Sequence, residues 1–219
     1  MPVELLVRQS IIGKLASSLG RREEGPNVEL AQRIVKMEDK AAVKELVENL
    51  SNGKSAVQAD CVKVLYEIGD RKPKLISGFA RQFLDLLGSK NNRLVWGAMT
   101  ALDSITLEKP TTIVDSLPKI TEIANKGSVI TRDHAVSILT KLASVRKYEA
   151  KAVPLLIEQL ENCPGNQLPM YAEGLPPIVN DANRGVFIKT LGSRLGGIEK
   201  ESKRKRVEKV MKQISRPDS

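Results

Sequence analysis

Few side chains of this sequence have the type and spacing that catalysis or metal binding requires. The chain of 219 residues has one histidine, His134, and two cysteines, Cys61 and Cys163, which lie far apart in the sequence. A zinc site needs several such ligands close together, and the sequence contains no phosphate-binding loop, nucleophile elbow or zinc-protease motif. We therefore predict no metal, no cofactor, no small-molecule substrate and no enzymatic activity.

Basic side chains indicate a different chemistry, the binding of anions. The net charge is +9, of which residues 182–219 carry +7. The densest run near the C-terminus contains Lys203, Arg204, Lys205 and Arg206. A helix with such a run is typical either of a solvent-facing cap or of an electrostatic contact with RNA, DNA or an acidic protein.

A second set of basic residues recurs along the sequence. Lys72, Lys109 and Arg146 are spaced by 37 residues, and Arg184 follows one residue beyond the next step. We expect them in the loops that follow the second helix of each repeat. There they either offset helix dipoles or follow a phosphate backbone. With aromatic residues at only 3% of the chain, base stacking is disfavoured.

The spacing of 37 also governs the apolar residues, which must form the elements that position these cations. One predicted helix carries its apolar residues on a single face, and the set recurs in phase over four copies. The first copy is Val57, Cys61, Val64, Leu65 and Ile68. A second stripe of the same period begins at Ile76. Each repeat is therefore predicted to be a pair of amphipathic helices, A and then B.

One position of helix B is small in every copy, which lets helices approach closely. It is occupied by Cys61, Ala98, Ala135 and Ala172. The period, the paired helices and the V-x-x-x-A-x-x-A-L stripe resemble the HEAT-repeat family, close to its armadillo relatives. Pro118 and Pro154 within the A helices add to the likeness. The resemblance implies an all-α, right-handed α-α superhelix, a solenoid of about five to six helix pairs.

We expect residues 1–219 to form a single repeat domain, with clear repeats from about 39 to 180. Two looser pairs flank them: helices near 3–19 and 27–37, and a basic capping pair near 183–195 and 199–214. Pro176 and Pro177 fall in helix B of the fifth pair. Because a proline inside a helix costs about 3 kcal/mol, we expect that helix to be short or bent.

The resemblance implies a concave face lined by the B helices. Residues of those helices outside the apolar stripe are therefore candidates for contact with a protein partner. They are Gln58, Lys63, Arg93, Trp96, Thr100, Arg132, Asp133 and Met170. Arg132 alone retains the arginine that the family has near the start of helix B, where other repeats have Gln58, Val95 and Pro169. Trp96 is either a binding anchor or ordinary packing between helices.

An enzyme is a third interpretation. Trp96 and Asp133 hold equivalent positions in successive repeats. This pair is similar to the aromatic and aspartate residues that face DNA in alkylpurine DNA glycosylases built on HEAT-like repeats. The Trp-Asp signature of that family and a second tryptophan are missing, so a scaffold remains the main prediction.

The sequence thus predicts a non-enzymatic scaffold or adaptor that binds a protein partner through the concave helix-B face. The alternative is a nucleic-acid or ribosome-associated binder that uses the two basic sets. No apolar run approaches the ~18 residues of a membrane helix, and the N-terminus lacks signal-peptide features. Two cysteines fit a reducing compartment. We therefore expect a cytoplasmic protein without a membrane partner.

Overall fold

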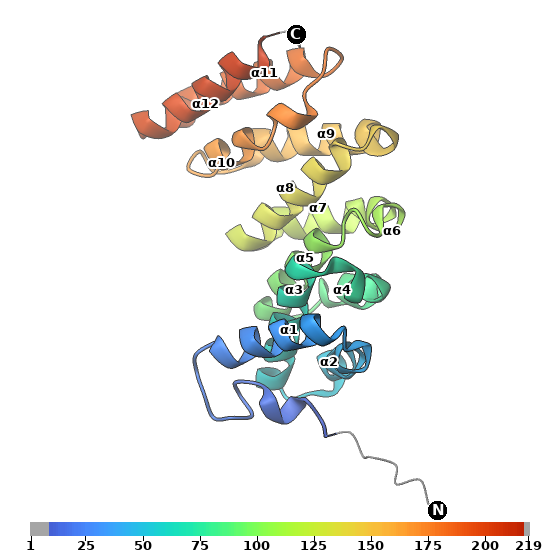
Figure 1. The fold of residues 1–219 in the computed structure, drawn as a ribbon. Helices are drawn as coiled ribbons and strands as arrows, with labels where there is room; N and C mark the ends of the chain where they lie inside the picture. Colours follow the sequence, from blue (N-terminus) through green and yellow to red (C-terminus); the bar gives the residue numbers. More distant parts are fainter. Residues whose placement is uncertain (1–8, 217–219) are drawn as a thin grey trace, which may run out of the picture. The chain divides into compact units, whose positions relative to one another are not determined.

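A computed structural model describes residues 9–216, and their regular structure is entirely helical. No strand occurs within this range, so the all-α prediction is confirmed for it. The chain divides into two compact units, Met1–Lys109 and Pro110–Ser219, called here unit 1 and unit 2. Figure 1 labels their helices. The prediction of a single domain over 1–219 stays a prediction.

Unit 1 contains paired helices that correspond to the predicted A and B elements. Its α-helices are α1 (Gly25–Met37), α2 (Lys40–Asn52), α3 (Ser55–Arg71), α4 (Ala80–Leu86) and α5 (Asn92–Ser104). Short 3-10 turns lie at Ile12–Lys14, Pro73–Leu75 and Ser77–Phe79. Within this unit α3 packs against α1, α2 and α5, and α4 packs against α5.

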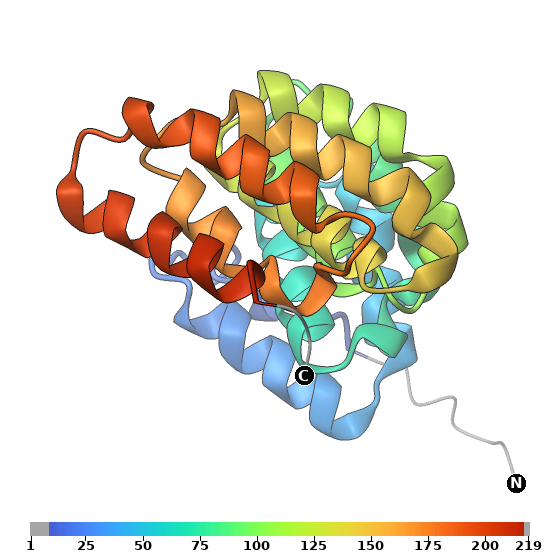
Figure 2. The same cartoon turned by 90° about the horizontal axis from the view of Figure 1, so that it is seen from above.

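Unit 2 continues the alternation. Its α-helices are α6 (Pro110–Asp115), α7 (Leu117–Lys126), α8 (Val129–Ala143), α9 (Arg146–Asn162), α10 (Leu168–Glu173), α11 (Arg184–Arg194) and α12 (Glu201–Ile214). Further 3-10 turns lie at Pro176–Ile178 and Leu195–Gly197. Figure 2 shows α11 and α12 as a hairpin, which corresponds to the predicted capping pair.

The repeated small position of helix B is buried throughout. Cys61 and Ala98 in unit 1, and Ala135 and Ala172 in unit 2, are all 0% exposed. Most apolar residues that share their stripe are buried as well, and Val57 at the start of α3 is half-buried, so each unit has a continuous core. Because the stripe repeats in phase, each B helix presents the same apolar face to its neighbours.

The approach of α3 to α5 is set by a residue next to the small position. A Cβ atom built on Gly97 would lie 2.9 Å from both methyl carbons of Val62. Such a distance is shorter than carbon atoms tolerate, so a larger residue at this position would push the two helices apart.

Polar residues precede several helices. Asp39, Asn91 and Ser128 precede α2, α5 and α8, and each side chain accepts a hydrogen bond from a backbone N–H two or three residues later. These contacts satisfy N–H groups that the first helical turn leaves without partners.

Prolines lie within or next to the less regular helices. α10 has six residues and is followed by the 3-10 turn that contains Pro176 and Pro177, so the expected short helix is confirmed. Pro154 lies inside α9. Pro118 lies in the first turn of α7, because the A helix of that repeat breaks between α6 and α7.

The helix predicted near 3–19 is wrong over the part that the structure describes. Residues 3–8 lie outside the described range, and residues 9–19 contain only the 3-10 turn Ile12–Lys14. The backbone N–H groups of Ala16 and Ser17 donate to the side chains of Asn27 and Asp60 instead of to helical carbonyls. The helix predicted at 27–37 is present as α1, and it packs mainly on α3.

Candidate functional site

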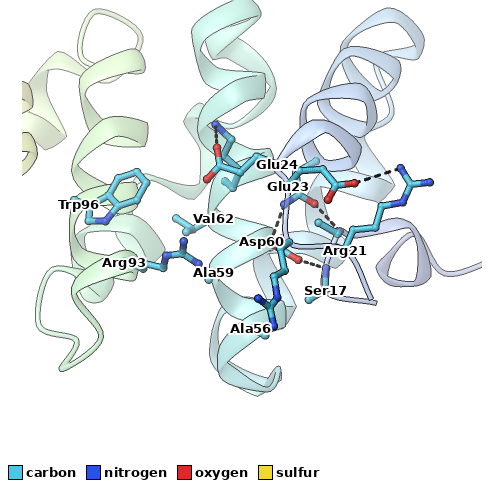
Figure 3. A pocket seen from close by; sticks show the side chains of 14 residues that line it. Ser17, Arg21, Glu23, Glu24, Ala56, Ala59, Asp60, Val62, Arg93 and Trp96 are labelled. Atoms are coloured by element: carbon cyan, nitrogen blue, oxygen red, sulfur yellow. Dashed lines mark hydrogen bonds and ion pairs between the residues drawn. The ribbon is translucent and has the colours of Figure 1, made fainter. Parts of the chain in front are cut away.

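A cavity of about 350 Å3 opens on the B-helix face of unit 1. It is bounded by the segment before α1 and by α1, α3 and α5, and we call it the unit 1 groove. Three predicted contact residues line it, namely Lys63, Arg93 and Trp96. Figure 3 shows Trp96 and Arg93 on one wall, Asp60 on the central helix, and Arg21 with Glu23 on the other side.

Asp60 holds the segment before α1 against α3. One carboxylate oxygen accepts a hydrogen bond from the Ser17 N–H at 2.7 Å, and the other accepts one from Asn27 Nδ2 at 2.8 Å. Asn27 is 1% exposed, and its Oδ1 accepts from the Ala16 N–H at 3.0 Å. Because both oxygens of Asp60 are engaged, this side chain stabilises the wall of the groove rather than offering a free acceptor.

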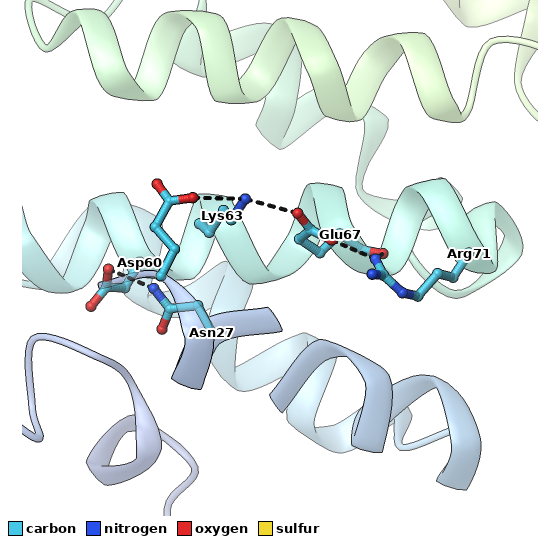
Figure 4. Close-up of polar contacts among 6 residues, drawn as sticks. Asn27, Asp60, Lys63, Glu67 and Arg71 are labelled. Carbon is cyan, nitrogen blue, oxygen red and sulfur yellow. Dashed lines mark hydrogen bonds and ion pairs between the residues drawn. The ribbon is translucent and has the colours of Figure 1, made fainter. Parts of the chain in front are cut away.

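Lys63 lies at the centre of a chain of charges along α3. Its Nζ is 3.0 Å from Glu24 Oε2 and 2.8 Å from Glu67 Oε1, and it lies 4.8 Å above the Tyr66 ring. Glu67 also pairs with Arg71, as Figure 4 shows. Burial alone would lower the pKa of Lys63, but its hydrogen bonds with Glu67, Tyr66 and Glu24 outweigh burial and raise the pKa.

The pKa of Glu67 is shifted in the opposite direction, below its ordinary value. Burial would raise the pKa of its carboxyl, but hydrogen bonds from Lys63 and Arg71 bring the pKa below its ordinary value. Both Lys63 and Glu67 have side chains that are largely shielded, at 14% and 16% exposure. The charges of this chain therefore compensate one another inside the wall of the groove.

Trp96 and Arg93 differ from these residues because their polar or aromatic groups remain accessible. Trp96 is half-buried, and its ring centroid lies 5.8 Å from that of Tyr66 in a tilted arrangement. Arg93 is exposed, and its guanidinium has no ion pair or hydrogen bond to any described residue. The two side chains together present an aromatic face and a cation to the groove.

Two predicted contact residues brace helices instead. Gln58 Nε2 donates to the Leu50 carbonyl at 2.9 Å, and Arg132 donates to the Asn125 carbonyl at 3.3 Å. Both carbonyls lie at the end of the A helix that precedes the B helix in question. The two side chains thus satisfy acceptors that a helix C-terminus leaves open.

The remaining predicted contact residues divide between core and surface. Thr100 is 6% exposed, and its hydroxyl donates to the Trp96 carbonyl one helical turn earlier. Asp133 accepts a 2.6 Å hydrogen bond from the Tyr171 hydroxyl. Burial, together with Asp133, raises the pKa of Tyr171. Met170 is 48% exposed.

Every member of the predicted C-terminal cluster already contacts an acceptor within unit 2. Lys203 donates to the Asn166 carbonyl at 3.0 Å and Arg204 to the Ile198 carbonyl at 2.9 Å. Lys205 pairs with Glu201 at 2.7 Å. Arg206 makes two contacts of 2.7 Å with the Glu173 carboxylate, and the hydrogen bond lowers the pKa of that carboxyl.

The predicted cations at a spacing of 37 do not share one environment. Lys72 follows α3 and pairs with Glu38, whereas Lys109 is exposed beyond the end of α5. Arg146 and Arg184 are the first residues of α9 and α11, so the expected position in a loop is wrong for them. A helix dipole does not favour a cation there. Arg184 donates to the Ile214 carbonyl at 2.9 Å and pairs with Asp181.

Reactive groups are shielded or scattered. Cys61 is 0% exposed, and burial raises the pKa of its thiol to about 12, which disfavours the nucleophilic thiolate. Burial also raises the pKa of Cys163. Among the residues described, no group of three or more His, Cys, Asp or Glu side chains is placed to hold a metal ion.

Sequence reasoning missed the polar frame of the groove. The charges Lys63, Glu67 and Arg71 are spaced by four residues, which places them on one helical face and could have indicated their pairing. Asp60 and Asn27 carried no comparable signal, because their partners lie far away in the sequence. The arginines before α1 were also not singled out.

No protein-family model matches the sequence, and no curated protein matches it. Several solved structures share the fold. An engineered protein is 19% identical, with a TM-score of 0.62 over 94% of this chain and 97% of that chain. A designed armadillo repeat protein in complex with the peptide (KR)4 is 15% identical, with a TM-score of 0.69 over 90% and 92%. A second designed armadillo repeat protein is 14% identical, with a TM-score of 0.64 over 85% and 86%.

These likenesses confirm the predicted resemblance, and the chain has an armadillo-like, HEAT-like helical repeat fold. At identities of 14–19%, these likenesses concern the fold and not the activity or the partner. None of the helices between residues 9 and 216 combines the length and the apolar character that crossing a membrane would demand.

Proposed function

We propose that this protein is a non-enzymatic scaffold that binds a segment of another protein in the unit 1 groove. The observation that carries the proposal is that half-buried Trp96 and the exposed guanidinium of Arg93 line the same groove. The Arg93 guanidinium has no partner among the described residues. Tryptophan and arginine are the residues most enriched among those that dominate binding energy in protein interfaces. The chain contains no other tryptophan, so this feature is specific to one face of unit 1.

The frame of the groove supports the same interpretation. Asp60 and Lys63 connect α3 to the segment before α1 and to α1 itself through hydrogen bonds and ion pairs. A wall fixed in this way loses little conformational entropy when a ligand binds. The designed armadillo repeat protein with a similar fold was solved with a peptide bound, and a peptide is also the kind of ligand that a groove along stacked helices can accept.

The contacts favour a narrower set of binding residues than the sequence did. Gln58, Thr100, Arg132 and Asp133 use their polar groups inside the protein. We therefore assign binding in unit 1 to Arg93 and Trp96, with Lys63 as part of the wall. Met170 remains a candidate contact in unit 2, where it is exposed.

The nucleic-acid alternative receives less support from the contacts. Lys203, Arg204, Lys205 and Arg206 each contact an acceptor within the chain, and a phosphate would have to compete with it. Lys109 and Arg146 have no such contact among the described residues, so the alternative still has a test. Retention on mixed RNA at low salt that falls steeply with added salt would support it.

The test of the proposal is capture of a protein partner by the full chain, with nuclease present. Trp96→Ala should abolish capture of the protein, whereas Leu107→Ala, a change of an exposed apolar residue in unit 1 outside the groove, should not. Thermal unfolding should show only a modest loss of stability, about 1 kcal/mol, from the lost contact with Tyr66. Unchanged capture by Trp96→Ala would contradict the proposal, and a much larger loss of stability would make Trp96 a core residue.

A further inference from the structure

The charged residues of the unit 1 groove are not equally available to a ligand. Seven of them line it, four bases and three acids. Each acid already has a partner within the protein. Glu23 pairs with Arg21 at 3.6 Å, Glu24 pairs with Lys63 at 3.0 Å, and Asp60 accepts hydrogen bonds at 2.7 and 2.8 Å. A cationic ligand would therefore have to share each carboxylate of the groove with a basic residue of the protein, although Glu23 and Glu24 are 63% and 57% exposed.

The bases divide into two kinds. Arg21 and Lys63 take part in the ion pairs just described, whereas Arg22 and Arg93 are exposed and pair with no described residue. Each guanidinium is a planar group with several N–H donors, and its geometry matches a carboxylate. The unused binding capacity of the groove is thus cationic, although its lining residues nearly balance in formal charge.

From this we infer that the occupant of the unit 1 groove is an acidic segment of a partner protein, with carboxylates for Arg22 and Arg93 and an apolar side chain for Trp96. The inference rests on the proposed function and narrows the chemistry of the partner. Ala56, Ala59 and Val62 line the groove between the charged residues, so an apolar side chain of the ligand also finds an apolar surface.

A basic peptide fits this arrangement poorly. The face of Trp96 would attract a cation, but the neighbouring Arg93 would repel it, and no free carboxylate would compensate the charge. A basic ligand would have to separate Glu24 from Lys63, and the Lys63 side chain is only 14% exposed. Glu24 itself is 57% exposed, and exchanging one such ion pair for another yields little net binding energy.

A single-stranded nucleic acid fits less well than an acidic peptide. Such strands are bound by a track of cations along the backbone and by several aromatic residues on which bases stack. The groove has two unpaired cations and one accessible tryptophan among its described residues. Two carboxylates placed on either side of an apolar residue match this pattern more closely.

The test uses the full-length protein and three probe peptides. The acidic probe is Glu-Asp-Leu-Phe-Glu-Asp, the neutral one replaces the acids by Gln and Asn, and the basic one replaces them by Lys and Arg. Because the chain has one tryptophan, its intrinsic fluorescence reports directly on the groove. The acidic probe should change the Trp96 emission and bind about tenfold or more tightly than the basic probe at low salt. Oligo-dT serves as a fourth ligand.

Two charge reversals provide the matched variants. Arg93→Glu should weaken binding of the acidic probe by about tenfold or more, whereas Arg81→Glu, on the exposed side of α4, should have little effect. Circular dichroism and thermal unfolding establish that both variants fold. Arg22→Ala should weaken binding of the acidic probe less than Arg93→Glu does, because it removes a charge without reversing it.

Several outcomes would overturn the inference: no binding of the acidic probe at low salt, tighter binding of the basic probe or oligo-dT, or equal effects of Arg93→Glu and Arg81→Glu. The proposed function has a separate test. If Trp96→Ala still abolishes capture of the protein partner while the acidic probe does not bind, the groove binds a partner of different chemistry. If capture is also unchanged, both proposals fail.

Discussion

The unit 1 groove and the cluster Lys203–Arg206 in helix α12 of unit 2 are both rich in charge, but only the groove contains basic side chains without a partner among the described residues. In α12, Lys203 and Arg204 donate to backbone carbonyls, while Lys205 and Arg206 pair with acids. In the groove, the acids are the residues with partners, and Arg22 is among the cations without one. Charge density along a sequence therefore does not measure the charge that a ligand can reach.

The two regions also use their contacts for different purposes. The groove contacts connect segments across the core of unit 1, since Asp60 reaches Ser17 and the buried Asn27. The contact between Arg206 and Glu173 connects two helices at the surface of unit 2, where both side chains are nearly half exposed. Shielded contacts should contribute more to stability than exposed ones, and this difference can be measured.

The largest effect is expected for Gly97→Val, because the added Cβ would lie 2.9 Å from the methyl carbons of Val62. We expect a loss of about 3 kcal/mol in the free energy of unfolding, measured by urea denaturation. Gly185→Val in α11 is the control, since a Cβ there meets nothing within 4 Å. The control should change stability by less than about 0.5 kcal/mol. Equal losses in the two variants would contradict the close approach of α3 and α5.

The next effect concerns Asp60→Ala. The change removes the acceptor of the Ser17 N–H and of Asn27 Nδ2, and leaves a buried amide unsatisfied. We expect destabilisation of about 2 kcal/mol in the same denaturation experiment. Asp60→Asn keeps one acceptor oxygen and should cost less. A neutral Asp60→Ala variant would mean that water replaces both contacts and that the wall of the groove is not fixed by Asp60.

The repeat architecture could be predicted because it depends on local periodicity. The spacing of 37 places Ala98 and Ala172 at the same buried position, and a helix stripe follows directly from such spacing. The break after α10 followed from the fixed backbone of Pro176 and Pro177. Both features can be predicted without knowing which distant residues contact each other in the folded protein.

The site could be predicted only in part, because contacts distant in the sequence decide it. Lys63, Arg93 and Trp96 were placed on the B-helix face by their register, and they line one cavity. Nothing in the register showed that Arg132 would bond to a helix end or that Arg204 would bond to the Ile198 carbonyl. The sequence predicts a helix near 3–19, because the hydrogen bonds of the Ala16 and Ser17 N–H groups to distant side chains leave no pattern in it.

A smaller effect is expected for Lys63→Met, and it should depend on pH. Lys63 and Arg71 hold the pKa of Glu67 below its ordinary value against the effect of burial. A carboxyl of this kind adds stability above its unfolded pKa, about 4.3, and the contribution is lost as the pH falls through its folded pKa. At pH 7 the variant should be less stable by about 1–2 kcal/mol.

The gap between the variant and the original protein should then narrow below about pH 4, as Glu67 becomes protonated in both. Urea denaturation at a series of pH values measures this gap. A constant gap at all pH values would show that Lys63 acts through the packing of its alkyl chain against Tyr66 rather than through its charge.

The smallest effect is expected for Arg206→Ala in α12. The two contacts with Glu173 are well formed at 2.7 Å, but the side chains are 47% and 45% exposed, so solvent screens the attraction. We expect a loss of about 0.2–1 kcal/mol in urea denaturation, which should shrink further at high salt. A loss as large as that of Asp60→Ala would make the surface pairs of unit 2 equal to the shielded contacts of unit 1. A small loss would instead be consistent with a solvated cap whose charges contribute little to folding.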